Sequence, residues 1–145
     1  SRALTCAMGQ LRGLRTLDMR VTTQSRSAGL IAERLTQHPV VSGVLYPGLA
    51  NHSGHEIAAR QMKGGFGGML SIRLMNRAAA IAVAANVQVW RRATSFGGIE
   101  SLIEHRASIE GEGSPCPDDL LRLSVGLEDP EDLYRDLIQA FRILS

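Results

Sequence analysis

The stretch LLRLSVGLEDPEDL, residues 120–133, combines a strand pattern with the start of a helix. Apolar residues alternate over residues 120–126, which predicts a half-buried strand, and they are Leu121, Leu123 and Val125. Asp129 then precedes Pro130 and an acidic first turn, which is typical of a capped helix N-terminus. The apolar face of that helix is predicted to consist of Leu133, Leu137, Phe141 and Leu144. A strand that leads directly into a helix indicates a mixed α/β fold.

A helical stripe occupies the first quarter of the chain. From residue 4 to about residue 37 the apolar positions step by three or four, which predicts one long helix or two helices joined near residues 25–27. Gly9 and Gly13 could kink the helix instead. Roughly 30 helical residues span about 45 Å, whereas a compact globule of this size is only about 40 Å across. We therefore expect part of the helix to project from its own domain and to pack on a surface outside this chain.

Strands and helices alternate after this helix. The predicted elements are strands over residues 40–46, 69–74 and 87–95, and helices over residues 55–62 and 77–86. Ser53 and Glu56 are spaced as a capping box for the first of these helices. The expected fold is α/β, an α+β two-layer sandwich with about four mostly antiparallel strands and helices mainly on one face.

Composition excludes several classes of protein. Of 145 residues, 44% are apolar and 21% charged, which is typical of one globular domain rather than of a disordered chain or a coiled coil. The net charge is +2, the basic residues are interleaved with acids, and aromatics are only 4%, so nucleic-acid binding is not favoured. No apolar run reaches the roughly 18 residues of a membrane span, and the first residues do not resemble a signal peptide, so a cytoplasmic location is expected. Cys6 and Cys116 are interpreted as reduced, ordinary thiols.

Three motifs suggest chemistry but have simpler local explanations. The glycines of residues 64–68 follow a helix and open a strand, which is the wrong order for a phosphate loop, so we interpret them as turn glycines. His52 and His55 form an H-x-x-H pair to which His38, His105 or Cys116 could add a ligand, but the pair flanks a loop-to-helix junction where polar residues cap for local reasons, so no metal site is predicted. Lys63 lies beside glycine at a predicted helix end, where a protonated, solvated ammonium group is expected rather than a Schiff base.

Two residues are candidates for binding a small anion. Arg122 interrupts a half-buried strand, and an arginine there needs an anionic partner to offset the cost of its desolvation. A carboxylate ligand fits the planar guanidinium group, but a salt bridge to Glu104 or Glu128 is an equally good explanation. Ser95 precedes a turn of Phe96 and two glycines, where its hydroxyl and the exposed backbone N–H groups also suit a carboxylate.

Four ordered blocks of the sequence resemble a known family. The blocks are LRGLRTLDMR, VLYPGLANHSGHEIAARQMKGGFGGMLSI, SFGGIESLIEHRAS and LLRLSVGLEDPEDL. Together they resemble the carboxy-terminal part of the Cys/Met-metabolism pyridoxal-phosphate enzymes, which include cystathionine γ-synthase, cystathionine γ- and β-lyases, methionine γ-lyase and the homoserine sulfhydrylases. The resemblance covers nearly the whole chain.

The resemblance implies the small C-terminal domain of a fold-type-I pyridoxal-phosphate enzyme. Residues 1–37 would then be a helix that links this domain to a larger, absent domain, and residues 38–145 would be the substrate domain. The cofactor and the catalytic residues would belong to the absent domain, so this chain alone is expected to bind no cofactor and to be inactive. Family members are typically homotetramers, which implies a homo-oligomer for the full-length protein.

The same resemblance implies the roles of particular residues. The family's L-R-[LF]-S motif corresponds to Arg122 and its S-[LF]-G-G turn to Ser95 with Phe96, which would bind the α-carboxylate of an amino-acid substrate. Several γ-specific members have glutamate where this chain has Thr94, so Thr94 is a candidate specificity residue. The implied reaction is elimination or replacement at Cβ or Cγ of sulfur amino acids or activated homoserine.

One alternative belongs to another class of protein. The chain could be a stand-alone, non-catalytic binding or oligomerisation module. Such a module predicts that the N-terminal helix folds back onto its own globule.

Overall fold

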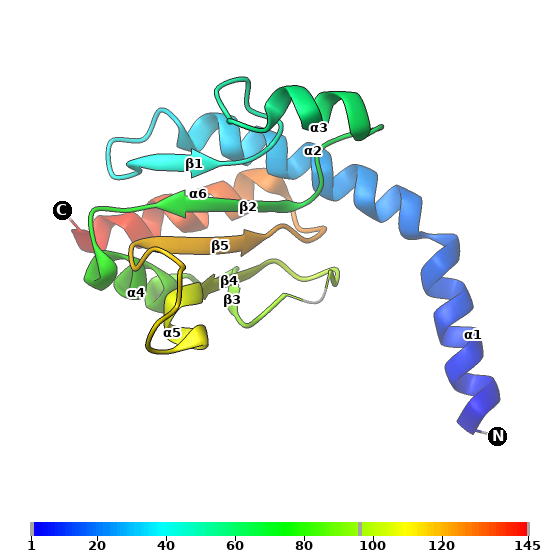
Figure 1. Ribbon diagram of the computed structural model, residues 1–145. Coiled ribbons are helices and arrows are strands. Elements are labelled where there is room, and N and C mark those ends of the chain that lie inside the picture. Colours follow the sequence, from blue (N-terminus) through cyan, green and yellow to red (C-terminus); the bar gives the residue numbers. More distant parts are fainter. Residues whose placement is uncertain (1, 96, 145) are drawn as a thin grey trace.

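The computed structural model describes residues 2–95 and 97–144, and Phe96 therefore lies outside the described residues. The helices are α1 (Arg2–Arg15), α2 (Leu17–Leu35), α3 (His55–Gln61), α4 (Arg77–Asn86), α5 (Arg106–Glu110), α6 (Pro130–Phe141) and the short 3₁₀ helix η1 (Arg142–Leu144). The strands are β1 (Gly43–Leu45), β2 (Met69–Arg73), β3 (Arg91–Arg92), β4 (Leu102–His105) and β5 (Leu120–Ser124). Figure 1 shows a mixed α/β domain from which α1 projects.

The sheet has five strands in the order β1-β2-β5-β4-β3, rather than about four. Every neighbouring pair is antiparallel except β3 and β4, which are parallel. The additional strand is β4, which the sequence analysis did not predict. The strand predicted over residues 87–95 is reduced to Arg91–Arg92. The backbone N–H groups of residues 88–90, which precede it, donate hydrogen bonds to the Asp136 carboxylate instead of to a neighbouring strand.

The two faces of the sheet differ in character. Residues opposite one another in antiparallel strands share a face, and the register places Leu70, Ile72, Ile103, Leu121 and Leu123 on one of them. All five are at most 2% exposed, and they pack with residues of α2, α4 and α6. These helices cover the core face, as predicted (Figure 1). We call the opposite face, which carries Ser71, Glu104, Arg122 and Ser124, the open face.

The N-terminal helix breaks at Thr16, not near residues 25–27 as the sequence suggested. The break exposes the Gly13 carbonyl oxygen, which accepts a hydrogen bond from Arg20 Nη2 at 2.7 Å. Ser25 and Ser27 are instead buried inside α2, because they face the rest of the domain. The projection that we expected from helix length is present, since α1 extends away from the sheet in Figure 1. Its apolar side chains are exposed: Met8 by 64%, Leu11 by 57% and Leu14 by 67%.

Helix α3 does not begin with the predicted capping box. Its N-cap residue is Gly54, and no side chain caps it. The two nearby histidines make local hydrogen bonds instead. His52 Nδ1 accepts from the Gly54 N–H at 3.1 Å, and His55 Nδ1 donates to the Pro47 carbonyl oxygen at 2.8 Å. These contacts stabilise the chain around the start of α3.

The two other predicted helices begin where expected, although Leu144, predicted on the apolar face of the last helix, lies in η1 beyond the end of α6. Helix α4 spans the predicted residues, and the Asn76 side chain accepts a hydrogen bond from the Ala79 N–H at its start. Helix α6 begins with Asp129 as N-cap and Pro130 in the first turn, and Asp129 Oδ1 accepts from the Glu131 N–H at 2.8 Å. Both caps satisfy backbone donors that have no partner within the helix.

Tyr46 connects α2 to the glycine-rich loop. Its hydroxyl lies 3.1 Å from the Ser25 carbonyl oxygen and 3.0 Å from that of Gly67, and the residue is only 2% exposed. In the same loop Gly65 has a φ of +136°, and a Cβ there would lie 2.7 Å from Ser25 Cβ. The glycines therefore allow the loop to approach α2 closely, which agrees with their interpretation as turn residues.

The buried Tyr46 hydroxyl predicts a loss of stability at high pH. Burial raises its pKa from 10.0 to about 12. Because the folded-state pKa is above the unfolded value, the stabilisation is complete below pH 10 and is lost as the pH rises toward 12. Urea denaturation across this range should show a fall in the free energy of unfolding that is shallower in Tyr46→Phe. Tyr134→Phe is the control, and equal slopes in wild type and Tyr46→Phe would contradict the prediction.

Candidate functional site

Arg122 lies at the centre of the open face. Its neighbours across the sheet are Ser71 on β2 and Glu104 on β4. Arg122 Nη1 donates to Glu104 Oε1 at 2.9 Å, and the exposed fractions of the two side chains are 35% and 4%. Glu104 is thus the anionic partner, as one of the sequence-based alternatives predicted. The carboxylate of Glu128, the other acid considered, accepts hydrogen bonds from the Ser101 N–H at 2.9 Å and from Ser101 Oγ at 2.7 Å.

Glu104 also contacts Thr94. The Thr94 hydroxyl donates to Glu104 Oε2 at 2.9 Å, so the two carboxylate oxygens have different partners. Arg106 Nη1 lies farther from Oε1, at 3.6 Å. The principal partner of Arg106 is Glu110, which its Nε contacts at 2.6 Å, and this hydrogen bond raises the pKa of Arg106.

Ser95 is joined to the same face through Ser124. Its Oγ donates to Ser124 Oγ at 2.8 Å and accepts a longer hydrogen bond from the Gly97 N–H at 3.3 Å. Ser124 follows Arg122 by two residues on β5, so both side chains lie on the open face. We call Thr94, Ser95, Glu104, Arg122 and Ser124 the open-face cluster.

The structure therefore brings together three of the four residues singled out from sequence, while Phe96 lies outside the described residues. It adds Ser124, which the sequence analysis treated only as part of the motif around Arg122, and it gives Glu104 two partners. The contact of Glu104 with Arg122 follows from the antiparallel register of β4 and β5, and the contacts of Ser124 and Glu104 with the other residues follow from where the loop of Thr94 and Ser95 lies. The missing signal was β4 itself, because without that strand nothing placed Glu104 opposite Arg122.

The open-face cluster has unused capacity to bind an anion. Within the described part of the chain, the Arg122 side chain makes one hydrogen bond, from Nη1. Its Nε and Nη2 donors remain available, and two N–H groups of a guanidinium match the two oxygens of a carboxylate. The partial exposure of Arg122 leaves it accessible to a small ligand.

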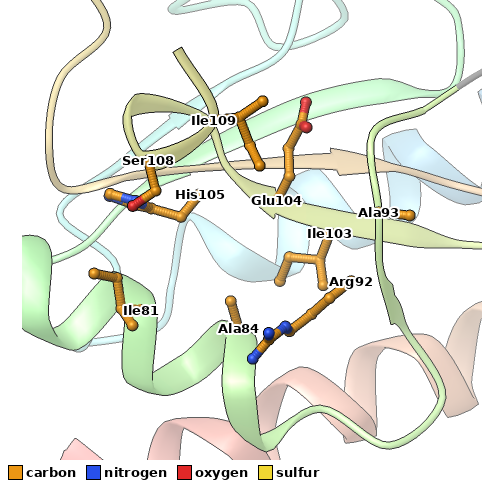
Figure 2. A pocket seen from close by; sticks show the side chains of 9 residues that line it. All are labelled: Ile81, Ala84, Arg92, Ala93, Ile103, Glu104, His105, Ser108 and Ile109. Atoms are coloured by element: carbon orange, nitrogen blue, oxygen red, sulfur yellow. The ribbon is translucent and has the colours of Figure 1, made fainter. Parts of the chain in front are cut away.

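A cavity of about 320 Å³ lies between α4, β4 and α5 (Figure 2). Its lining is mainly apolar and includes Ile81, Ala84, Ile103 and Ile109. Glu104 of the open-face cluster also lines it, whereas Arg122 and Ser95 do not, so the candidate anion site lies beside this cavity rather than inside it. Figure 2 shows the Glu104 side chain pointing away from Ile103, as expected for consecutive strand residues.

His105, at the edge of this cavity, has structural partners. The residue is 7% exposed, and its ring nitrogens lie 2.6 Å from Ser108 Oγ and 2.5 Å from the Asp118 carbonyl oxygen. In the described residues there is no group of three His, Cys, Asp or Glu side chains that could hold a metal ion. None of the described helices is both long and apolar enough to cross a membrane.

Comparison with known proteins identifies the family. The model of the Cys/Met metabolism PLP-dependent enzymes matches residues 4–142. The chain belongs to this family. It is 54% identical over 136 residues to cystathionine gamma-synthase of Mycobacterium tuberculosis, and this match covers 90% of the chain and 35% of the relative. It is 44% identical over 137 residues to cystathionine beta-lyase of Lactococcus lactis, with 89% of the chain and 36% of the relative covered.

A solved structure extends the comparison to the fold. Cystathionine gamma synthase from Xanthomonas oryzae, in complex with aminoacrylate and cysteine, matches with a TM-score of 0.84 and 44% identity. The match covers 91% of this chain and 36% of that one. The chain therefore spans about a third of the length of the relatives that it matches, and the fold of that third is conserved between them.

The single lysine of this chain is not placed where it could hold the family's cofactor. Lys63, its single lysine, is exposed just beyond the end of α3 and does not line the cavity of Figure 2. A lysine in this position is surrounded by solvent and has no enclosed pocket in which to react with an aldehyde. We therefore assign no cofactor-binding role to the described residues.

Proposed function

We propose that this chain is the substrate-binding domain of a PLP-dependent trans-sulfuration enzyme. The whole protein would carry out elimination or replacement at Cβ or Cγ of sulfur amino acids or of activated homoserine. The observation that supports this most strongly is the open-face cluster, which presents a partly exposed arginine with free donors in a chain of this family. The free donors matter because a purely structural ion pair between Arg122 and Glu104 would not need them.

Each residue of the proposed site has a physical role. Arg122 would bind the α-carboxylate of the amino acid through two N–H groups. Ser95, whose hydroxyl is already held by Ser124, and the adjacent Phe96 would complete the pocket around that carboxylate. Thr94 would contribute to the choice between β- and γ-chemistry. No residue of this chain is proposed to act as the catalytic base or nucleophile.

Other parts of the protein would supply the cofactor and the assembly contacts. The family relationship and the unsuitable position of Lys63 support a pyridoxal-phosphate site outside this chain. The exposed apolar side chains of α1 support a linking role for residues 1–37 between that portion and residues 38–145. We further propose a homotetramer, and a cytoplasmic location that agrees with two unpaired thiols, Cys6 and Cys116.

A chimeric enzyme tests the proposed function. Residues 4–142 of this chain would replace the matching segment of M. tuberculosis cystathionine gamma-synthase. We expect the chimera to retain cystathionine synthase activity within about tenfold of its parent, because the positioning of substrate by this domain would be preserved. A parent enzyme that lacks the segment is the control and should be inactive. A soluble chimera that carries the cofactor but has no activity would contradict the proposal.

The stand-alone module receives less support. It predicts that the N-terminal helix folds back onto the domain, whereas α1 projects from it (Figure 1). Reading the DNA upstream of the Ser1 codon separates the two hypotheses directly. An in-frame cofactor domain supports the enzyme, and a start codon immediately upstream supports the module.

A further inference from the structure

We propose that Glu104 is a positioning residue that orients Arg122 for carboxylate binding and couples it to Thr94. This inference rests on the proposed function for its biochemical consequence, but its structural part can be tested without it. It concerns a residue that the family resemblance did not single out.

The environment of Glu104 is that of a carboxylate held in place. It is 5% exposed, and removal of a carboxylate from water is costly unless every oxygen has a partner. Here Oε1 accepts from Arg122 Nη1 and Oε2 from Thr94 Oγ1, each at 2.9 Å. The backbone fixes the first of these contacts as well, because Glu104 and Arg122 are direct partners between β4 and β5.

This contact selects one arrangement of a flexible side chain. A long arginine side chain loses rotational freedom when it binds a ligand, and an existing hydrogen bond reduces that cost. Because Glu104 engages Nη1, the guanidinium plane is set while Nε and Nη2 stay free. Glu104 would thus increase affinity by pre-organisation, although its negative charge by itself repels a carboxylate ligand.

The second carboxylate oxygen, Glu104 Oε2, couples Arg122 to Thr94. Thr94 immediately precedes Ser95, whose hydroxyl contacts Ser124 on the strand that carries Arg122. One carboxylate therefore connects the start of the Ser95 turn to the arginine. Thr94→Val should consequently weaken binding through Arg122, even though Thr94 itself makes no contact with Arg122 among the described hydrogen bonds.

The first experiment uses this chain as it is. Nitrogen-15 NMR of the arginine side chains, with Arg122 assigned through Arg122→Lys, reports how fast its guanidinium group rotates. We expect restricted rotation in the wild type, free rotation in Glu104→Gln, and restricted rotation in the control Glu112→Gln, whose residue is exposed. Free rotation in the wild type, or restricted rotation in Glu104→Gln, would overturn the positioning role.

The second experiment uses the chimeric enzyme. Glu104→Gln should raise KM for the amino-acid substrate about tenfold with kcat nearly unchanged, and Thr94→Val should raise it by a smaller factor. A merely structural role would reduce the amount of active enzyme and leave KM as it was. A lower KM in Glu104→Gln would show that charge repulsion outweighs pre-organisation and would overturn the inference. An inactive parent chimera would instead count against the proposed function, and the NMR result would still decide the positioning of Arg122.

Discussion

Arg122→Ala in the chimeric enzyme is expected to lower kcat/KM by about 30- to 1,000-fold, or about 2 to 4 kcal/mol of transition-state stabilisation. The variant loses the two donors proposed to bind the α-carboxylate, and the substrate then lacks its anchor during the reaction. It also leaves Glu104, whose side chain is only 4% exposed, without its main cationic partner. Steady-state kinetics at several substrate concentrations measures the effect.

Two further variants separate the guanidinium from its charge. Arg122→Lys keeps a positive charge but loses the planar pair of donors, so its kcat/KM should lie between those of wild type and Arg122→Ala. Arg135→Ala changes an arginine on α6 whose side chain is 72% exposed, and it should behave as wild type. If Arg122→Ala retained full catalytic efficiency, Arg122 would be removed from the site.

Asp136→Ala is expected to lower the free energy of unfolding by about 3 to 5 kcal/mol. Asp136 is 5% exposed, and its carboxylate accepts hydrogen bonds from three consecutive backbone N–H groups that precede β3. They belong to Gln88 at 2.9 Å, Val89 at 2.7 Å and Trp90 at 3.0 Å. Alanine would leave these donors without a partner, and hydrogen bonds to a charged acceptor are stronger than average.

Urea denaturation of the 145-residue chain measures this loss. Asp132→Ala in the same helix is the matched control, because residue 132 is exposed, and it should cost less than about 1 kcal/mol. An equally small effect for Asp136→Ala would mean that water replaces the carboxylate without penalty. Function need not change in parallel, because Asp136 lies on the helical side of the domain, away from Arg122.

The sequence predicted an element correctly where its local apolar pattern also determined which face of that element packs in the core. The capped helix after Asp129 and the strand with alternating leucines have the predicted character, because the face that is apolar in sequence is the face that packs in the core. The alanine-rich helix of residues 77–86 has the predicted ends, and the Asn76 side chain caps its start.

Sequence reasoning failed where distant residues decided the structure. Ser25 looked like a helix break, but its Oγ accepts from the Gly67 N–H at 3.1 Å, so the helix continues and uses its serine to hold a loop. Strand β4 was missed because Glu104 and His105 give it a polar sequence, although both are buried and paired. The capping box failed because Gly54 takes the N-cap position.

In the candidate site, too, the local sequence pattern predicted one part and distant residues decided the other. Sequence alone identified Arg122 and required an acid for it, since a half-buried cation needs one. It could not choose between Glu104 and Glu128, because that choice depends on the register of a strand that was not predicted. The roles of Arg122 and Thr94 remain predictions that the proposed experiments test, and the binding role of Ser95 also remains a prediction.

The place of β5 in the sheet sets how this anchor can behave. It is the third of five strands, bonded on both edges, and Arg122 is its middle residue. The Cα of that arginine cannot shift without breaking hydrogen bonds to both neighbouring strands. The backbone that carries Arg122 is therefore more rigid than a loop would be. Amino-acid substrates of different length would then all place their α-carboxylate at the same position. Residues that contact the far end of the substrate side chain would have to discriminate between them.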